Sequence, residues 1–160
     1  MWLRKLPTET MPARERAPLW KCKDCGREFA NRNQSHACAT HDLEHHFEGK
    51  APAIRAIYDA FVGELEKIGP VRVLPEKTRI AFQVRMSFAQ LTPRRNWVDG
   101  HLVLAQRIEH PRFTRVETFS PRNHLHAFRL SSPAEVDAQL REWMAEAYAV
   151  GDQRHLERDA

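Results

Sequence analysis

The sequence has no run of apolar residues that approaches the roughly 20 needed to cross a membrane. Residues 1–18 are rich in basic side chains but contain no apolar segment of the kind that a secretory signal requires. These two absences argue against a membrane protein and against an exported one. We therefore expect a cytoplasmic, reducing environment and no membrane partner.

Recognisable catalytic motifs are also missing. The sequence contains no serine or cysteine nucleophile motif, no phosphate-binding P-loop and no glycine-rich dinucleotide fingerprint. We therefore favour a non-enzymatic binding module, and an enzyme is the alternative hypothesis.

Cysteine is scarce, and its three residues are clustered. Cys22, Cys25 and Cys38 fall within one 17-residue window of a chain of 160 residues. An odd, clustered set in a chain without an export signal argues against a disulfide framework and for a metal site. Cys22-x2-Cys25-Gly26 has the spacing of a zinc knuckle, in which two thiolates on a tight turn share one ion. The glycine allows the left-handed backbone that such a turn needs.

Two further ligands must come from the following segment, which offers three candidates for the two positions: His36, Cys38 and His41. Four protein ligands leave no open coordination position, so the predicted zinc ion is structural. Trp20 and Phe29 are expected to form a small apolar core, because a module of this size takes its folding energy from the metal. The preferred ligands are Cys22, Cys25, His36 and Cys38, with His41 as the alternative.

The composition of the whole chain is that of a globular protein, with 42% hydrophobic and 29% charged residues. Changes in composition and periodicity divide it into four parts. We predict a disordered leader over 1–19, a zinc-binding module over 20–41, an α+β domain over 42–153 and a frayed tail over 154–160.

Helical periodicity flanks strand periodicity within the α+β domain. Apolar residues recur at helical spacing from Ala51 to Ile68, and a capping box at Ser132–Glu135 marks the start of a second helix that ends at Gly151. The expected fold is a zinc knuckle or ribbon, a helix, an antiparallel sheet of about five or six strands and a C-terminal helix. Segments that alternate with a period of two lie at 71–75, 78–84, 87–93, 101–108, 113–119 and 124–130.

Lysine is absent between residues 79 and 129, a span that carries nine arginines and three acidic residues. Arginine favours forked hydrogen bonds to phosphate groups, so basic side chains near predicted turns, with one tryptophan, suggest a surface for nucleic acid or another phosphate-bearing partner. One alternative is that these charges belong to a solvated sheet edge that resists aggregation. Another is that the preference for arginine over lysine reflects only codon usage. The candidate residues are Lys77, Arg79, Arg85, Arg94, Arg95 and Trp97.

A histidine-lined site is the second hypothesis, for an enzyme or a small-ligand-binding domain. His124 and His126 alternate along one predicted strand and therefore point to the same face. With His101 and Glu117 they would form an acid–base or metal-binding group. The alternative interpretation is that two histidines line the polar end of a sheet face. A third hypothesis is a protein–protein adaptor that uses the zinc module.

Several segments resemble a known family, among them WKCKDCGREFANRNQSHAC, GPVRVLPEKTRIAF, RRNWVDGHLVL and EVDAQLREWMAEAYAVG. They are similar to an uncharacterised bacterial family that has a domain of unknown function preceded by a short zinc-ribbon-like module. The resemblance extends from Trp20 to Gln153 and implies the ligand set Cys22, Cys25, His36 and Cys38. Related domains accompany nuclease-like or defence-associated proteins, so by association the resemblance favours nucleic acid as the partner.

Overall fold

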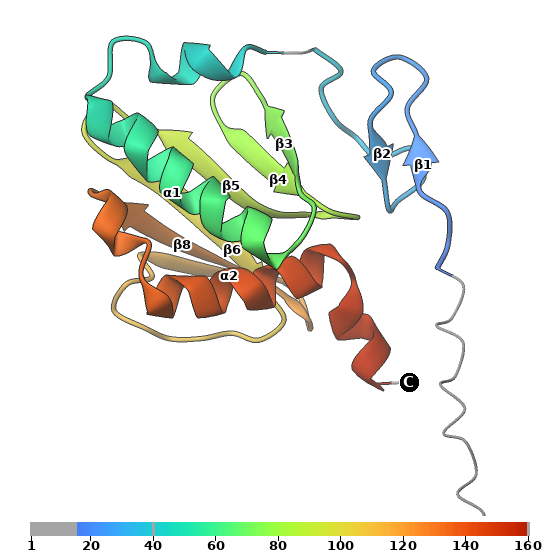
Figure 1. Cartoon of the computed structure of the whole chain (residues 1–160). Coiled ribbons are helices and arrows are strands. Elements are labelled where there is room, and N and C mark those ends of the chain that lie inside the picture. The colour runs from blue at the N-terminus through green and yellow to red at the C-terminus, as the bar shows by residue number, and fades with distance from the viewer. Residues whose placement is uncertain (1–15, 40, 160) are drawn as a thin grey trace, which may run out of the picture.

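A six-stranded antiparallel sheet forms the centre of the protein in the computed structural model, which describes residues 16–39 and 41–159 (Figure 1). The spatial order is β3-β4-β5-β6-β8-β7, so the last hairpin joins the sheet through its second strand. The predicted α+β class with an antiparallel sheet is confirmed. The strands are β3 (Arg72–Pro75), β4 (Ile80–Gln83), β5 (Ser87–Pro93), β6 (Val98–Leu104), β7 (Arg115–Ser120) and β8 (Asn123–Leu130).

Two long helices, α1 (Pro52–Ile68) and α2 (Ala138–Gly151), cover the same face of this sheet (Figure 1). Their apolar stripes pack on the side chains that alternate inward along the strands, which is where the core lies. Members that are fully buried include Ile57, Phe61, Leu65, Phe82, Leu91, Leu102 and Leu140.

The second helix begins later than the sequence predicts. The capping box of Ser132 and Glu135 belongs to a separate 3₁₀ turn, η2 (Pro133–Glu135). The chain then becomes extended at Asp137, whose carboxylate accepts a hydrogen bond from the main-chain N–H of Leu140 at 3.0 Å and so caps α2. A second N-cap four residues downstream of Pro133 therefore starts the helix.

The predicted leader and tail are only partly described. Residues 1–15 lie outside the described residues. Arg16 bonds the side chain and the main-chain carbonyl of Asp152, just after α2. Residues Arg154–Asp159, where we predicted a frayed tail, form the 3₁₀ helix η3. Among the described residues, no helix is both long and apolar enough to cross a membrane.

The N-terminal module is a short hairpin of β1 (Trp20–Lys21) and β2 (Glu28–Phe29), and it lies beside β3 and β4 (Figure 1). The side-chain amide of Gln83 donates to the carbonyl of Glu28 at 2.6 Å, and Arg72 forms an ion pair with the Glu28 carboxylate. The N–H of Ala30 bonds the carbonyl of Arg85 at 3.1 Å. The module is thus held against the sheet by specific polar contacts.

Candidate metal centre and the uncovered sheet face

The turn between β1 and β2 presents the first two cysteines. The N–H of Cys22 bonds the carbonyl of Arg27 at 2.9 Å, and the N–H of Gly26 returns to the carbonyl of Cys22 at 3.0 Å. Gly26 has a φ of 74°, in the left-handed region that favours glycine. This backbone has the geometry expected for the zinc knuckle.

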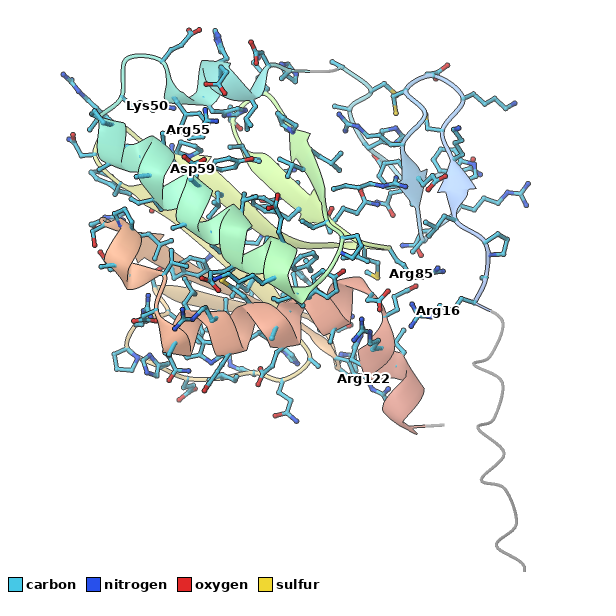
Figure 2. The ribbon with its side chains drawn as sticks, viewed as in Figure 1. Arg16, Lys50, Arg55, Asp59, Arg85 and Arg122 are labelled. Carbon is cyan, nitrogen blue, oxygen red and sulfur yellow. The ribbon has the colours of Figure 1, made fainter. Side chains whose placement is uncertain are left out.

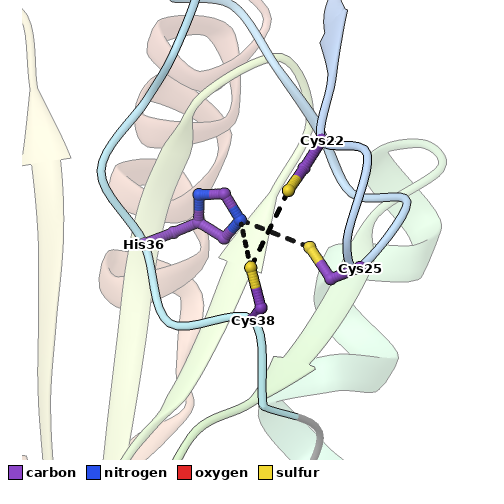
Figure 3. Close-up of side chains that lie close together, drawn as sticks. All are labelled: Cys22, Cys25, His36 and Cys38. Carbon is purple, nitrogen blue, oxygen red and sulfur yellow. Dashed lines mark hydrogen bonds between the residues drawn. The ribbon is translucent and has the colours of Figure 1, made fainter.

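Four potential ligand atoms converge at this turn, from Cys22, Cys25, His36 and Cys38, and all lie within 4.8 Å of one another. His36 Nε2 lies 3.3 Å from the sulfur of Cys25 and 3.4 Å from that of Cys38, and the sulfurs of Cys22 and Cys38 are 3.7 Å apart (Figure 3). A tetrahedral zinc ion with Zn–S bonds of about 2.3 Å requires sulfur–sulfur edges of about 3.8 Å. The group is therefore of the right size and donor type to hold a metal ion.

The imidazole of His36 is held in the orientation that ligation needs. Its Nδ1 atom lies 2.6 Å from the main-chain carbonyl of Gln34, which can only accept, so Nδ1 carries a proton and Nε2 is the ring nitrogen that faces the sulfurs. The ring also packs on Phe29, with centroids 4.4 Å apart, and Phe29 contacts Trp20 at 6.0 Å. The small apolar core predicted from Trp20 and Phe29 is thus present.

The thiols affect one another's ionisation. Main-chain hydrogen bonds from Cys25 and Asp24 lower the pKa of the Cys22 thiol to about 6, and these outweigh the opposing effect of burial. The hydrogen bond to Cys22 in turn raises the pKa of Cys38 to about 11, and burial and the repulsion between two neighbouring thiolates add to this effect. A divalent cation removes that repulsion, as expected for a cysteine-rich metal site.

His41, the alternative ligand, is exposed and lies outside this group of four. The structure therefore gathers the preferred set of ligands and leaves the alternative in the connecting segment before η1 (Leu43–Phe47).

The predicted arginine-rich surface is only partly brought together. Lys77 and Arg79 occupy the β3–β4 turn, and Arg94, Arg95 and Trp97 occupy the β5–β6 turn at the same end of the antiparallel sheet.

Arg85 lies at the opposite end of the strands from these two turns. Its guanidinium bonds the side chain of Gln153 at 3.0 Å and the carbonyl of Ala17 at 2.7 Å. Figure 2 shows it near Arg16, beyond the end of α2. Arg85 therefore lies apart from the β5–β6 turn, although it lines a cavity together with Arg79.

The face of the sheet opposite the helices gathers two arginines that the sequence analysis missed. Strand pairing aligns Gln90, His101, Ala127 and Arg115 in one row across β5, β6, β8 and β7. The next row contains Asp99 and Arg129. Arg115 and Arg129 both lie in the lysine-free span, but only the strand order places them side by side. With Arg94, they line a polar concavity of about 330 Å³.

Asp99 forms ion pairs with two of the three arginines in this concavity. Its carboxylate accepts from Arg94 Nε at 3.1 Å and from Arg129 Nε at 3.0 Å. Burial opposes ionisation of Asp99, but the hydrogen bonds from the two guanidinium groups prevail and lower its pKa. The Arg129 guanidinium also stacks over the ring of Trp97 at 4.4 Å.

His101 lies in the row beside Asp99, and its imidazole is uncharged at neutral pH. Burial, reinforced by the positive charges of Arg79 and Arg115, lowers the pKa of His101 to about 4. The ring therefore contributes a neutral donor and acceptor to the concavity and no cationic charge.

The histidine-lined site is wrong as a shared cleft. His126 pairs with the core residue Leu102 and is buried on the helix-covered face, whereas His101 points to the other face. The Nε2 atom of His126 accepts from the N–H of Ile108 at 2.9 Å, and its Nδ1 atom donates to the carbonyl of His124 at 2.9 Å. These contacts make His126 a hydrogen-bonded core residue.

The other two candidates for the histidine-lined site, His124 and Glu117, also direct their side chains to other partners. His124 bonds the hydroxyl of Thr118 at 2.9 Å. Glu117 sits on the edge strand β7, where its carboxylate pairs with Arg115 at 3.4 Å. The sequence hypothesis failed because residue alternation assigns a face within one strand but does not relate the faces of strands far apart in the chain.

The fold and the cysteine–histidine group define an α+β domain with a small N-terminal module that has the donor set of a metal site. Residues 43–151 match the family model described as "Domain of unknown function (DUF5655)", and the chain therefore belongs to that family. The match begins after the N-terminal module. No curated protein and no solved structure matches the chain.

Proposed function

We propose that this protein is a non-enzymatic, zinc-containing module that binds nucleic acid on the uncovered face of its sheet. The observation that carries the proposal is the concavity on that face, where Arg94, Arg115 and Arg129 meet although they come from separate parts of the chain. Forked guanidinium groups on a shared surface suit phosphate oxygens.

The charges of the concavity favour an anionic ligand. Asp99 is shared between Arg94 and Arg129, so one negative charge faces two positive ones. The ion pairs of Arg79 with Glu76 and of Arg115 with Glu117 are at least half exposed at the arginine. An exposed ion pair contributes only about 0–1 kcal/mol to the stability of a protein. A guanidinium can therefore exchange its carboxylate partner for a phosphate at a small cost in free energy.

The zinc ion has a structural role in this proposal. Cys22, Cys25, His36 and Cys38 would occupy all four positions of a tetrahedral ion, which leaves none for a substrate. The ion would fix the β1–β2 hairpin, and Glu28 on that hairpin contacts Gln83 and Arg72 on the sheet. The ion would thus hold the hairpin rigidly beside the uncovered face.

The proposal is tested by fluorescence anisotropy of the zinc-loaded protein with single- and double-stranded DNA and RNA across a salt series. Binding should weaken steeply as salt rises, because phosphate contacts release counterions. The double substitution Arg94→Ala/Arg115→Ala should weaken binding about tenfold and reduce the salt slope by about 1–2.

A matched control removes two positive charges from the helical side of the domain. Lys67 on α1 and Arg141 on α2 both pair with Glu64, away from the concavity. The double substitution Lys67→Ala/Arg141→Ala should leave affinity nearly unchanged. Absence of binding at low salt, or equal loss in both double variants, would refute a nucleic-acid site on the uncovered face.

A further inference from the structure

A second cavity, of about 450 Å³, lies between the N-terminal module and the sheet. We propose that it accepts one unstacked nucleobase of a single-stranded nucleic acid. This inference rests on the proposed function and specifies it further, because it names the strand form and the part of the ligand that is bound. The volume is within the range of about 300–1,000 Å³ typical of small-ligand sites.

A residue in the wall of the cavity, Gln83, carries a buried acceptor that no described residue satisfies. Gln83 is 1% exposed, and its Nε2 atom donates to the carbonyl of Glu28 at 2.6 Å. Since that carbonyl can only accept, the orientation of the amide is fixed by its partner, and Oε1 must be the other atom. Oε1 is buried and has no hydrogen-bond partner among the described residues, and Gln83 lines the cavity.

The unpaired Oε1 atom of Gln83 can bind some parts of a nucleotide and not others. Oε1 needs a hydrogen-bond donor, N–H or O–H, and an unsatisfied buried acceptor is costly. A phosphate group has acceptor oxygens only, so it cannot fill this role. Nucleobases carry amino or imino N–H groups on their edges, and a base that has left the stack can present them to a protein.

Part of the remaining lining also suits a base. Phe29 and Met86 supply an aromatic and an apolar surface, and the side-chain amides of Gln34 and Gln90 add donors and acceptors at the wall. Base faces stack favourably on aromatic rings in proteins that bind single strands. The cavity therefore combines a surface for stacking with groups that recognise an edge.

The position of the cavity connects it to the arginine-lined concavity. Gln90 lines both, and Arg79 Nη1 bonds Gln90 Oε1 at 3.4 Å between them. A base in the cavity would direct its sugar–phosphate chain across Gln90 toward Arg115. A duplex cannot do this without unpairing, because its bases are stacked inside the helix.

The inference is tested with two single-stranded oligonucleotides of equal length and charge, about ten nucleotides long, one normal and one with abasic sugars throughout. The wild-type protein should bind the normal strand about tenfold more tightly than the abasic one. Gln83→Leu removes the acceptor and should reduce this ratio severalfold, with stacking on Phe29 accounting for what remains.

A control variant separates base binding from docking of the module. Arg72→Ala also removes a contact to Glu28, but Arg72 does not line the cavity, so the ratio should stay near tenfold. Equal affinity of wild type for both strands, or an equal fall in ratio for both variants, would overturn the inference and leave the phosphate site standing. Failure of both strands to bind at low salt would instead refute the proposed function.

Discussion

The Nδ1 atom of His36 lies 2.6 Å from the main-chain carbonyl of Gln34 and donates its proton to it. Nε2 is thereby left as the metal-binding nitrogen, and it faces the sulfurs of Cys25 and Cys38. A hydrogen bond between residues two apart in the chain thus fixes the orientation of the His36 ring, independently of a bound metal.

The first prediction concerns metal content. Purified protein should contain about one equivalent of zinc, because the described residues hold one group of four suitable donors. Cys25→Ser should lose that equivalent, whereas His41→Ala should keep it, since His41 lies outside the group. Elemental analysis by mass spectrometry measures both. Full zinc retention by Cys25→Ser would refute the site.

The second prediction is that chelation unfolds the module and leaves the α+β domain folded. Within its described residues the module has a small ring cluster of Trp20, Phe29 and His36, whereas the domain has its own core. After zinc removal, amide hydrogen exchange should rise over residues 20–38 and remain slow in β5 and β6. Loss of protection in the central strands would show that the domain depends on the metal.

The third prediction contrasts two glycines. A Cβ atom at Gly100 would lie 2.8 Å from the ring of Phe128 and 3.0 Å from Leu91, so Gly100→Ala should destabilise the protein by about 1–3 kcal/mol. Gly63 lies within α1 with open space around it, and Gly63→Ala should stabilise by about 0.5–1 kcal/mol. Urea denaturation measures both, and shifts of equal sign would contradict the packing described.

The fourth prediction concerns pH. The pKa of His101 is about 4 in the folded protein and about 6.5 in the unfolded chain. Since the folded state binds the proton less tightly, the contribution to stability is full above pH 6.5 and is lost as pH falls toward 4. Between pH 7 and 5, wild type should lose about 1 kcal/mol more than His101→Gln, after allowance for partial solvent exposure.

Comparing the two proteins at each pH cancels the effect of protonating the zinc ligands, which they share. Nuclear magnetic resonance titration of the His101 ring provides a direct check. A midpoint near 6.5 would contradict the burial and the charges that surround this imidazole.

The sequence predicted the elements well where short-range spacing governs them. Cys22 and Cys25 share a turn, and Ile54, Ile57, Phe61 and Leu65 form one helical stripe, because both patterns depend on residues a few positions apart. The start of α2 was misplaced because Ser132 and Asp137 both carry capping signals, and local sequence does not rank them.

Spacing along the chain by itself determined that a cysteine–histidine module precedes an α+β domain. Only the tertiary structure decided which face of the sheet stays uncovered, and that Arg94, Arg115 and Arg129 meet there. The reason is the strand order β6-β8-β7, which sets residues from distant segments in adjacent rows. Periodicity within a strand encodes two faces, but the pairing of strands and the packing of helices decide which face is buried.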